Sequence, residues 1–185
     1  WGRQALEECY VPEAPALKRV VVGVDPSGGV AETGVVVCGL GVDGKGYVLA
    51  DLSCGGHPSE WSKTVVDGYH GWQADRVVVE RNFGGEMAAH VIKTVDRNVS
   101  LKEVSASRGK IPRAEPVANL YVQGRVHHVG RFPKLEDQMT SYTVEDKVSP
   151  DRMDALVWAL SELMVSGRQY RDVSPGGVTG QSHWR

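Results

Sequence analysis

Val20-Val21-Val22-Gly23-Val24-Asp25 is a nearly continuous apolar run that ends in an acid. Such a run of β-branched residues is typical of a central strand that is buried on both faces of a sheet. The turn-forming sequence Pro26-Ser27-Gly28-Gly29 ends it. An acid at the end of a buried strand is costly to bury unless it is paired or binds a metal. The stretch therefore predicts the middle of a sheet with a carboxylate at its edge that needs partners.

Two further stretches end or begin in acids. Val77-Val78-Val79-Glu80 repeats the first pattern, and Asp151 and Asp154 open an amphipathic helix one turn apart. If the two strands are neighbours, Asp25 and Glu80 meet at one edge of the sheet and Asp154 can face them. Alone, each acid has a structural explanation, which is a turn for Asp25, the helix dipole for Asp154 and helix capping for Asp151.

Together these acids predict a site for hard cations. Carboxylate oxygens and retained waters suit Mg²⁺, and two divalent ions about 4 Å apart can activate water and stabilise the leaving oxygen of a phosphodiester. We therefore expect Asp25, Glu80 and Asp154 to be catalytic metal ligands, with Asp151 as a weaker fourth candidate.

The remaining pattern predicts a mixed α/β sheet of five or slightly more strands, with helices on both faces. The first three strands form an antiparallel meander, because Val42-Asp43-Gly44-Lys45-Gly46 carries the Asp-Gly signal of a hairpin. The expected strands are 20–25, 35–40, 47–52, 76–80, 101–104 and, as a shorter candidate, 126–129. The expected helices are 58–69, 86–97, 114–123, 134–142 and 151–165.

One domain is expected, with an extension at each end. Residues 1–18 contain two prolines and little periodicity, and we interpret them as a linker or arm. Residues 19–166 form the domain, and residues 167–185, rich in Gly and Ser, are expected to be a flexible tail. A first residue other than Met indicates a processed product or an excised domain.

Composition excludes several classes of protein. The chain has 185 residues, a formal net charge of −2 and three cysteines without zinc spacing, which predicts free thiols in a reducing compartment. No apolar run is long enough to span a membrane, and no signal peptide is recognised. There is no Walker-type ATP motif and no Gly-x-Ser-x-Gly motif.

Basic residues concentrate between residues 108 and 134, where the only acid is Glu115. A patch of this kind can contact phosphates, although a solvated surface explains it equally well. We expect residues 105–113 to be a polar loop, in which Lys110 and Arg113 hold the scissile phosphate or stabilise charge in the transition state. The candidate DNA-binding residues are Arg108, Lys110, Arg113 and Arg125.

The order of these motifs resembles the nuclease domain of the large terminase subunit of tailed double-stranded DNA bacteriophages, which has a ribonuclease H-like fold. The likeness runs from about residue 20 to 165, and its most specific part is the Asp-x-x-Asp-Ala-x-x-Trp-Ala ending. The motifs that carry it are Val22–Gly28, Val78–Gly85, Gly109–Val117, Gly124–Gly130, Leu135–Met139 and Ser149–Ala159.

The resemblance implies that Asp25, Glu80 and Asp154 bind Mg²⁺ or Mn²⁺, as two ions, and that the domain cuts concatemeric viral DNA during packaging in the host cytoplasm. It also implies an N-terminal ATPase domain on the same polypeptide, with the small terminase subunit and the portal or procapsid as partners. The near-neutral charge then indicates weak DNA binding by the isolated domain, which would limit stray cutting.

Two other interpretations stay open at this stage. A Holliday-junction resolvase or transposase-like nuclease would use a similar acid triad on the same fold. A non-catalytic module that binds the packaging motor or capsid would keep the fold and need no acids, so the presence of all three argues against it.

Overall fold

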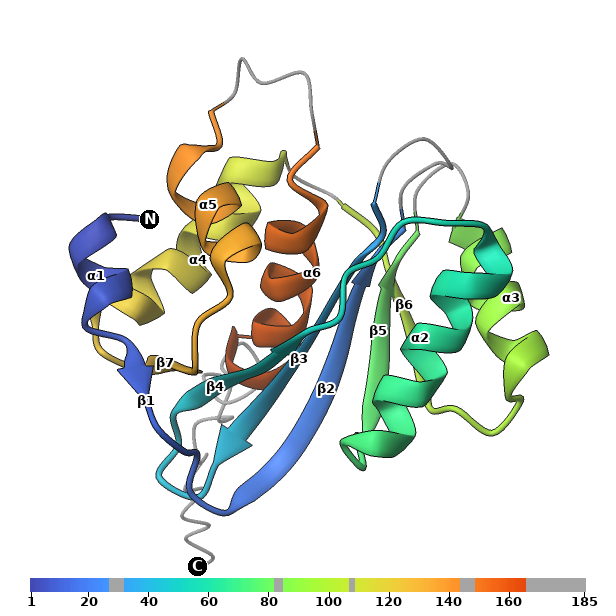
Figure 1. Cartoon of the computed structure of the whole chain (residues 1–185), viewed down its shortest axis with the longest axis horizontal. Coiled ribbons are helices and arrows are strands. Elements are labelled where there is room, and N and C mark those ends of the chain that lie inside the picture. The colour runs from blue at the N-terminus through green and yellow to red at the C-terminus, as the bar shows by residue number, and fades with distance from the viewer. Residues whose placement is uncertain (27–31, 82–84, 107–108, 144–148, 166–185) are drawn as a thin grey trace, which may run out of the picture.

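A seven-stranded mixed sheet forms the centre of the molecule, with the strand order β1-β7-β4-β3-β2-β5-β6 (Figure 1). The computed structural model describes residues 1–26, 32–81, 85–106, 109–143 and 149–165. The strands are β1 Tyr10–Val11, β2 Leu17–Asp25, β3 Gly34–Gly41, β4 Gly46–Asp51, β5 Arg76–Glu80, β6 Leu101–Val104 and β7 Val126–Val129. The helices are α1 Arg3–Glu7, α2 Pro58–Gly71, α3 Gly85–Val95, α4 Lys110–Val122, α5 Pro133–Ser141, α6 Asp151–Leu160 and the π-helix Ser161–Val165.

The predicted antiparallel meander is confirmed. β2 pairs with β3, and β3 pairs with β4, both antiparallel. Gly44 in the hairpin between β3 and β4 has a φ of 79°, a conformation that glycine adopts at little cost. β5 then returns beside β2 in parallel, so that Val24 lies opposite Val79. This pairing brings the carboxyl ends of the first and fourth predicted strands together.

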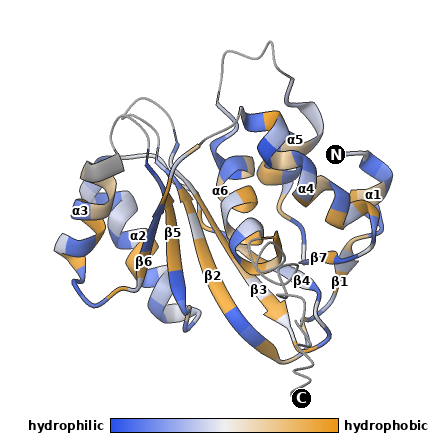
Figure 2. Ribbon diagram, turned by 180° about the vertical axis from the view of Figure 1, so that it is seen from behind, coloured by the Kyte–Doolittle hydropathy of each residue, from blue (hydrophilic) through white to orange (hydrophobic). Residues whose placement is uncertain are grey.

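Helices cover both faces of the sheet, as expected. α2 and α3 bury one set of alternate strand residues, including Val22 and Val24, against Trp61 and Ile92. α4, α5 and α6 bury the other set, including Val21 and Val36. Figure 2 shows the result from behind, with β2 and β5 running between the α2–α3 pair and α6. The alternation of side chains along a strand explains the two separate cores.

Helix α6 lies unusually close to the sheet. A Cβ atom on Gly23 would lie 2.1 Å from the carbonyl oxygen of Ala155, and one on Gly34 would lie 1.9 Å from that of Asp151. Only glycine leaves room for the helix backbone at this distance. The glycine that interrupts the valine run of β2 therefore seats the helix that carries Asp154.

Four local expectations need correction or comment. α4 begins at Lys110, so residues 110–113 of the predicted loop are helical instead; the first-turn Pro112 is tolerated because its N–H would be unpaired there anyway. The last predicted helix is α-helical only to Leu160 and continues as the π-helix. The segment 1–18 contains α1 and β1 and buries Leu6 and Cys9. The tail expected at 167–185 lies outside the described residues.

Within the ranges that the structure describes, no helix combines the length and the apolar character needed to cross a membrane.

Candidate active site

Three acids from distant parts of the sequence gather at one edge of the sheet. Asp25 ends β2, Glu80 ends the neighbouring β5, and Asp154 lies in the first turn of α6 above them. Their residues are 4%, 8% and 0% exposed. The structure therefore brings together the residues that the sequence analysis singled out, in a setting where isolated charge is costly.

Asp154 is neutralised by two cations of α4. Lys110 Nζ donates to its Oδ2, and Arg113 donates to its Oδ1 at 2.8 Å. Lys110 also contacts the hydroxyl of Ser149 at 2.5 Å. Lys110 and Arg113 are three residues apart and so share one face of α4. That face is turned toward the start of α6, which explains how a fully buried carboxylate is accommodated.

Glu80 is held by a tryptophan that the sequence analysis did not assign to the site. The indole Nε1 of Trp158 donates to Glu80 Oε2 at 3.1 Å. Arg113 lies 4.4 Å above the centre of the same indole and 3.6 Å from Glu80 Oε1. The sequence could have indicated this role through its spacing, because Trp158 follows Asp154 by four residues and a helix places such residues on one face.

Asp25 is the most perturbed acid of the site. Burial, followed by the charges of Asp154 and Glu80, raises the pKa of Asp25 to about 9, and Lys110 partly opposes this. Like charges close together in a buried site disfavour ionisation. A perturbed carboxyl of this kind, influenced by the charges of neighbouring acids, is typical of a functional site.

Asp151 does not cap α6. The N-cap position is Pro150, and no side chain caps the helix. Asp151 is itself the first helical residue and is buried; burial raises its pKa, whereas a hydrogen bond with Ser149 and the charge of Lys110 lower it. Its position one turn before Asp154 keeps it at the same end of α6, so a role beside the triad stays a prediction.

The four basic candidates have different locations. Lys110 and Arg113 lie among the acids, as described above. Arg125 precedes β7, and its carbonyl accepts a hydrogen bond from the N–H of Gly46, at the end of the sheet opposite Asp25. Arg108 lies outside the described residues. DNA binding by each of them stays a prediction.

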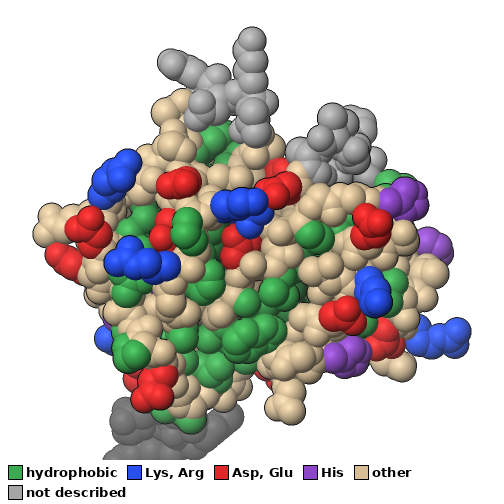
Figure 3. All heavy atoms as spheres, in the orientation of Figure 1, with side chains coloured by type: hydrophobic (Ala, Val, Ile, Leu, Met, Phe, Trp, Pro, Cys, Tyr) green, Lys and Arg blue, Asp and Glu red, His purple; other side chains and the backbone are tan. Residues whose placement is uncertain are grey.

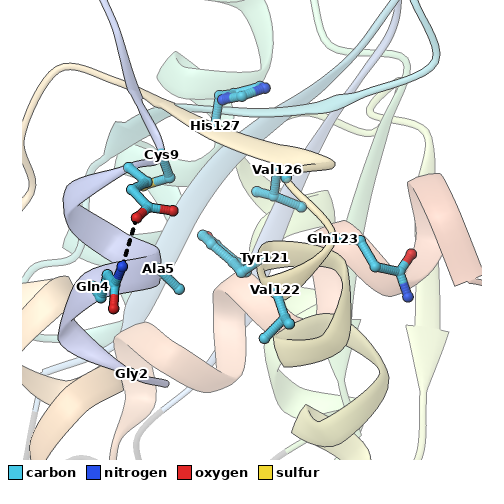
Figure 4. A pocket seen from close by; sticks show the side chains of 11 residues that line it. Gly2, Gln4, Ala5, Cys9, Tyr121, Val122, Gln123, Val126 and His127 are labelled. Atoms are coloured by element: carbon cyan, nitrogen blue, oxygen red, sulfur yellow. Dashed lines mark hydrogen bonds between the residues drawn. The ribbon is translucent and has the colours of Figure 1, made fainter.

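A pocket of about 570 Å³ lies elsewhere, between α1, the end of α4 and β7 (Figure 4). Gln4, Cys9 and Tyr121 are among its lining residues, and Gln4 bonds to Glu8 at its rim. Burial raises the pKa of the Cys9 thiol to about 11, so the thiol is not a nucleophile at neutral pH. The residues that line this pocket offer less chemistry than the three buried carboxylates, and we locate the site at the acids.

The acids suit a divalent cation in their chemistry. Three carboxylates share one region, where burial and then the charges of Asp154 and Glu80 raise the pKa of Asp25; a hard cation would relieve this repulsion. Within the described part of the chain, however, no three His, Cys, Asp or Glu side chains are arranged as a finished ligand set. Binding an ion would therefore require Asp154 to exchange contacts with Lys110 or Arg113 for contacts with the metal.

Solved structures with the same fold were found among phage terminases. The HK97 bacteriophage large terminase matches with a TM-score of 0.69 and 15% identity over 88% of this chain and 43% of that protein. The large terminase nuclease from thermophilic phage G20c matches with a TM-score of 0.64 and 14% identity over 85% of this chain and 96% of that domain. The yeast mitochondrial Holliday junction resolvase is more distant, with a TM-score of 0.54 and 15% identity over 91% and 86%.

These likenesses show a ribonuclease H-like α/β fold. The chain spans less than half the length of the HK97 large terminase. Among curated proteins, none matches the sequence. The model of the terminase RNaseH-like domain matches residues 22–163, which include all three acids and most of the chain. The chain therefore belongs to the family of terminase RNaseH-like domains.

Proposed function

We propose that this domain is a metal-dependent endonuclease that cuts concatemeric double-stranded viral DNA during genome packaging. The observation that carries the proposal is the convergence of Asp25, Glu80 and Asp154, three buried carboxylates, in a chain of the terminase RNaseH-like family. The G20c terminase nuclease has been crystallised with bound magnesium and with bound zinc. These complexes support the proposal that the present domain also uses a divalent ion.

In this proposal Asp25, Glu80 and Asp154 would hold two Mg²⁺ or Mn²⁺ ions, and the ions would supply activation of a water and stabilisation of the leaving oxygen. Trp158 keeps Glu80 in one orientation through its indole N–H. Lys110 and Arg113, which pair with Asp154 here, turn to the scissile phosphate when its negative charge is present. Preorganised cations of this kind lower the barrier because charge grows on the phosphate in the transition state.

Membership of the terminase family supports a proposal about partners. The HK97 large terminase is more than twice the length covered by this chain, and we propose an N-terminal ATPase domain on the same polypeptide. The small terminase subunit and the portal or procapsid would be further partners, and the host cytoplasm the place of action.

A Holliday-junction resolvase is the second candidate, because the yeast mitochondrial resolvase shares the fold. Its activity would favour four-way junctions over linear duplex of the same sequence. We expect the opposite preference, or none, because the family model that matches the chain describes terminases.

The direct test is cleavage of supercoiled plasmid with Mg²⁺, with Mn²⁺ and with EDTA. We expect nicked and linear products with either metal and none with EDTA. Cleavage that persists in EDTA would contradict the metal-dependent mechanism. A folded protein that never cuts with either metal would favour the alternative of a module that only binds the packaging motor or capsid.

Metal binding should become tighter as the pH rises. The folded protein keeps a proton on Asp25 up to about pH 9, whereas the unfolded chain loses it near pH 4. Without metal, stability should therefore fall as the pH rises through this range. An ion must displace the proton, so its apparent affinity should rise about tenfold per pH unit from about pH 6 to 9. Thermal melts at graded Mg²⁺ and several pH values measure both effects.

Asp25→Asn is the control for this measurement. The amide carries no titratable proton, so both the metal-free fall in stability and the rise in affinity should lose most of their pH dependence. An Asp25→Asn protein with the same pH profile as the parent would assign the proton to another group.

Trp158→Phe should slow cleavage about tenfold to a hundredfold without unfolding the protein. Phenylalanine keeps a ring under Arg113 but removes the N–H that orients Glu80, and a hydrogen bond to a charged group contributes about 1.5–3 kcal/mol. The rate of plasmid nicking at saturating metal measures the effect. Trp61→Phe is the matched control, since Trp61 is equally buried but lies on the other face of the sheet. Equal rates for both variants would remove Trp158 from the site.

A further inference from the structure

A second charged cluster lies where the π-helix that continues α6 meets the strands of the sheet. Glu162 in the π-helix accepts contacts from Arg19 at 2.7 Å, Arg76 at 3.0 Å and Lys102 at 2.7 Å. The three cations come from β2, β5 and β6. We call these four residues the basic cluster. π-Helical turns within helices are often found at functional sites.

The basic cluster and the acids face the same side of the sheet. Asp154, Trp158 and Glu162 follow one another at intervals of four residues, and each contacts strand or α4 residues on this side. Arg76 and Glu80 are four residues apart on β5, so their side chains leave the same face. At about 3.3 Å per residue, their backbones lie about 13 Å apart.

The charges of the cluster do not balance. One carboxylate faces three cations, which leaves a net charge of +2. The Glu162 side chain is 6% exposed, whereas those of Arg19, Arg76 and Lys102 are 33%, 38% and 42% exposed. Burial opposes ionisation of Glu162, but the hydrogen bonds from Lys102 and Arg19 lower its pKa. Each cation has more N–H donors than Glu162 uses, and each of the three side chains is partly open to solvent.

We propose that Arg19, Arg76 and Lys102 bind backbone phosphates of the same DNA duplex that is cut at the acids. This inference rests on the proposed function, since it takes DNA as the substrate. One turn of B-DNA is about 34 Å long, so a duplex that contacts both places needs less than a turn between them. Contacts to phosphates fix the position of a duplex without reading its sequence.

The mixed charge of the remaining surface makes a localised group of cations important for binding DNA. Figure 3 shows acidic and basic side chains interspersed on the face seen there, and the chain as a whole carries a charge of −2. General attraction to DNA is therefore weak, and a few localised cations contribute a large share of the binding. Glu162 holds these cations in place while reducing their net charge.

The test is binding of a fluorescent duplex of about 30 base pairs, measured by anisotropy in EDTA at about 50 mM salt and above. The double variant Arg76→Gln/Lys102→Gln should bind about tenfold more weakly, and the slope of log K against log salt should become shallower by about 2, or about 1 for each lost phosphate contact. Lys63→Gln is the control, because Lys63 is exposed on α2, which covers the other face. It should leave the slope nearly unchanged.

Glu162→Gln separates this proposal from a purely structural clamp. If the cations bind phosphates, removing the carboxylate raises the net charge of the cluster, and DNA affinity should rise even though the melting temperature falls. If the cluster only clamps the end of α6 to the sheet, the variants lower the melting temperature and leave affinity and salt slope unchanged, which would overturn the proposal. The assay needs no cleavage, so a protein that binds in this way but never cuts would refute only the proposed nuclease activity.

Discussion

Asp25→Asn, Glu80→Gln and Asp154→Asn should each reduce plasmid cleavage by about 10³-fold or more, because each removes a charged oxygen that a two-metal site needs. The effect should appear at saturating Mg²⁺ or Mn²⁺ and should not be rescued by more metal. Initial rates of nicking, measured beside the parent in the same buffer, give the loss. A variant that cuts within about tenfold of the parent would exclude its acid from catalysis.

The three variants should differ in melting temperature. Measuring it shows whether a variant has lost cleavage because its acid is missing or because the protein has unfolded. Asp25→Asn removes a buried carboxyl whose ionisation is opposed by burial and by its acidic neighbours, so the metal-free protein should melt at the same or a higher temperature. Asp154→Asn removes the ion pairs of Asp154 with Lys110 and Arg113 and leaves Arg113 paired with Glu80 alone, so this variant should melt lower. Asp67→Asn, an exposed acid on α2, should change neither melting nor cleavage.

Much of the architecture could be predicted because a strand that is buried on both faces of a sheet appears in the sequence as a continuous apolar run. The valine runs of β2 and β5 are the pattern of strands covered on both faces, and both strands are indeed buried. An acid that closes such a run is expensive unless it has a function or a partner. That cost made Asp25 and Glu80 conspicuous before any contact between them was known.

Other features depend on contacts between distant residues and carry no local signal. β1 has only two residues and is recruited by β7, more than a hundred residues later, so no periodicity could show it. The start of α4 was hidden because Pro112 lies in a basic stretch that imitates a loop, although a proline is compatible with the first turn of a helix; Pro116 lies further along, inside the helix. The basic cluster joins three strands that propensity cannot place side by side.

The π-helix shows a limit of a different kind. The spacing of Asp154, Trp158 and Glu162 is helical, and a helix from 151 to 165 was the natural expectation. The change from α to π geometry after Leu160 alters backbone hydrogen bonding without altering the apolar pattern. Sequence periodicity therefore indicated which residues share a face, but not the local geometry that presents Glu162 to three cations.

Gly23→Ala should destabilise the protein by about 3 kcal/mol, which corresponds to a fall in melting temperature of about 6–12 °C for a domain of this size. The new methyl group would lie 2.1 Å from the backbone oxygen of Ala155 and 3.0 Å from the Cβ of Ala159. β2 cannot move away, because it is paired with β3 on one side and β5 on the other. The helix must move instead, and thermal melts together with plasmid cleavage measure the result.

Movement of α6 should also impair catalysis, because Asp154 and Trp158 are carried by the displaced turns and small misplacements of reacting groups are costly. Gly39→Ala is the matched control on β3. Its methyl group would meet the flexible methyl groups of Leu17, at 2.9 Å, and of Leu49 rather than backbone, so a loss within about 1 kcal/mol is expected. If the Gly23→Ala and Gly39→Ala proteins had the same melting temperature and cleavage rate, the close packing of α6 on β2 would not be required to position the acids. A stable Gly23→Ala protein with impaired cleavage would instead separate the placement of Asp154 from the stability of the fold.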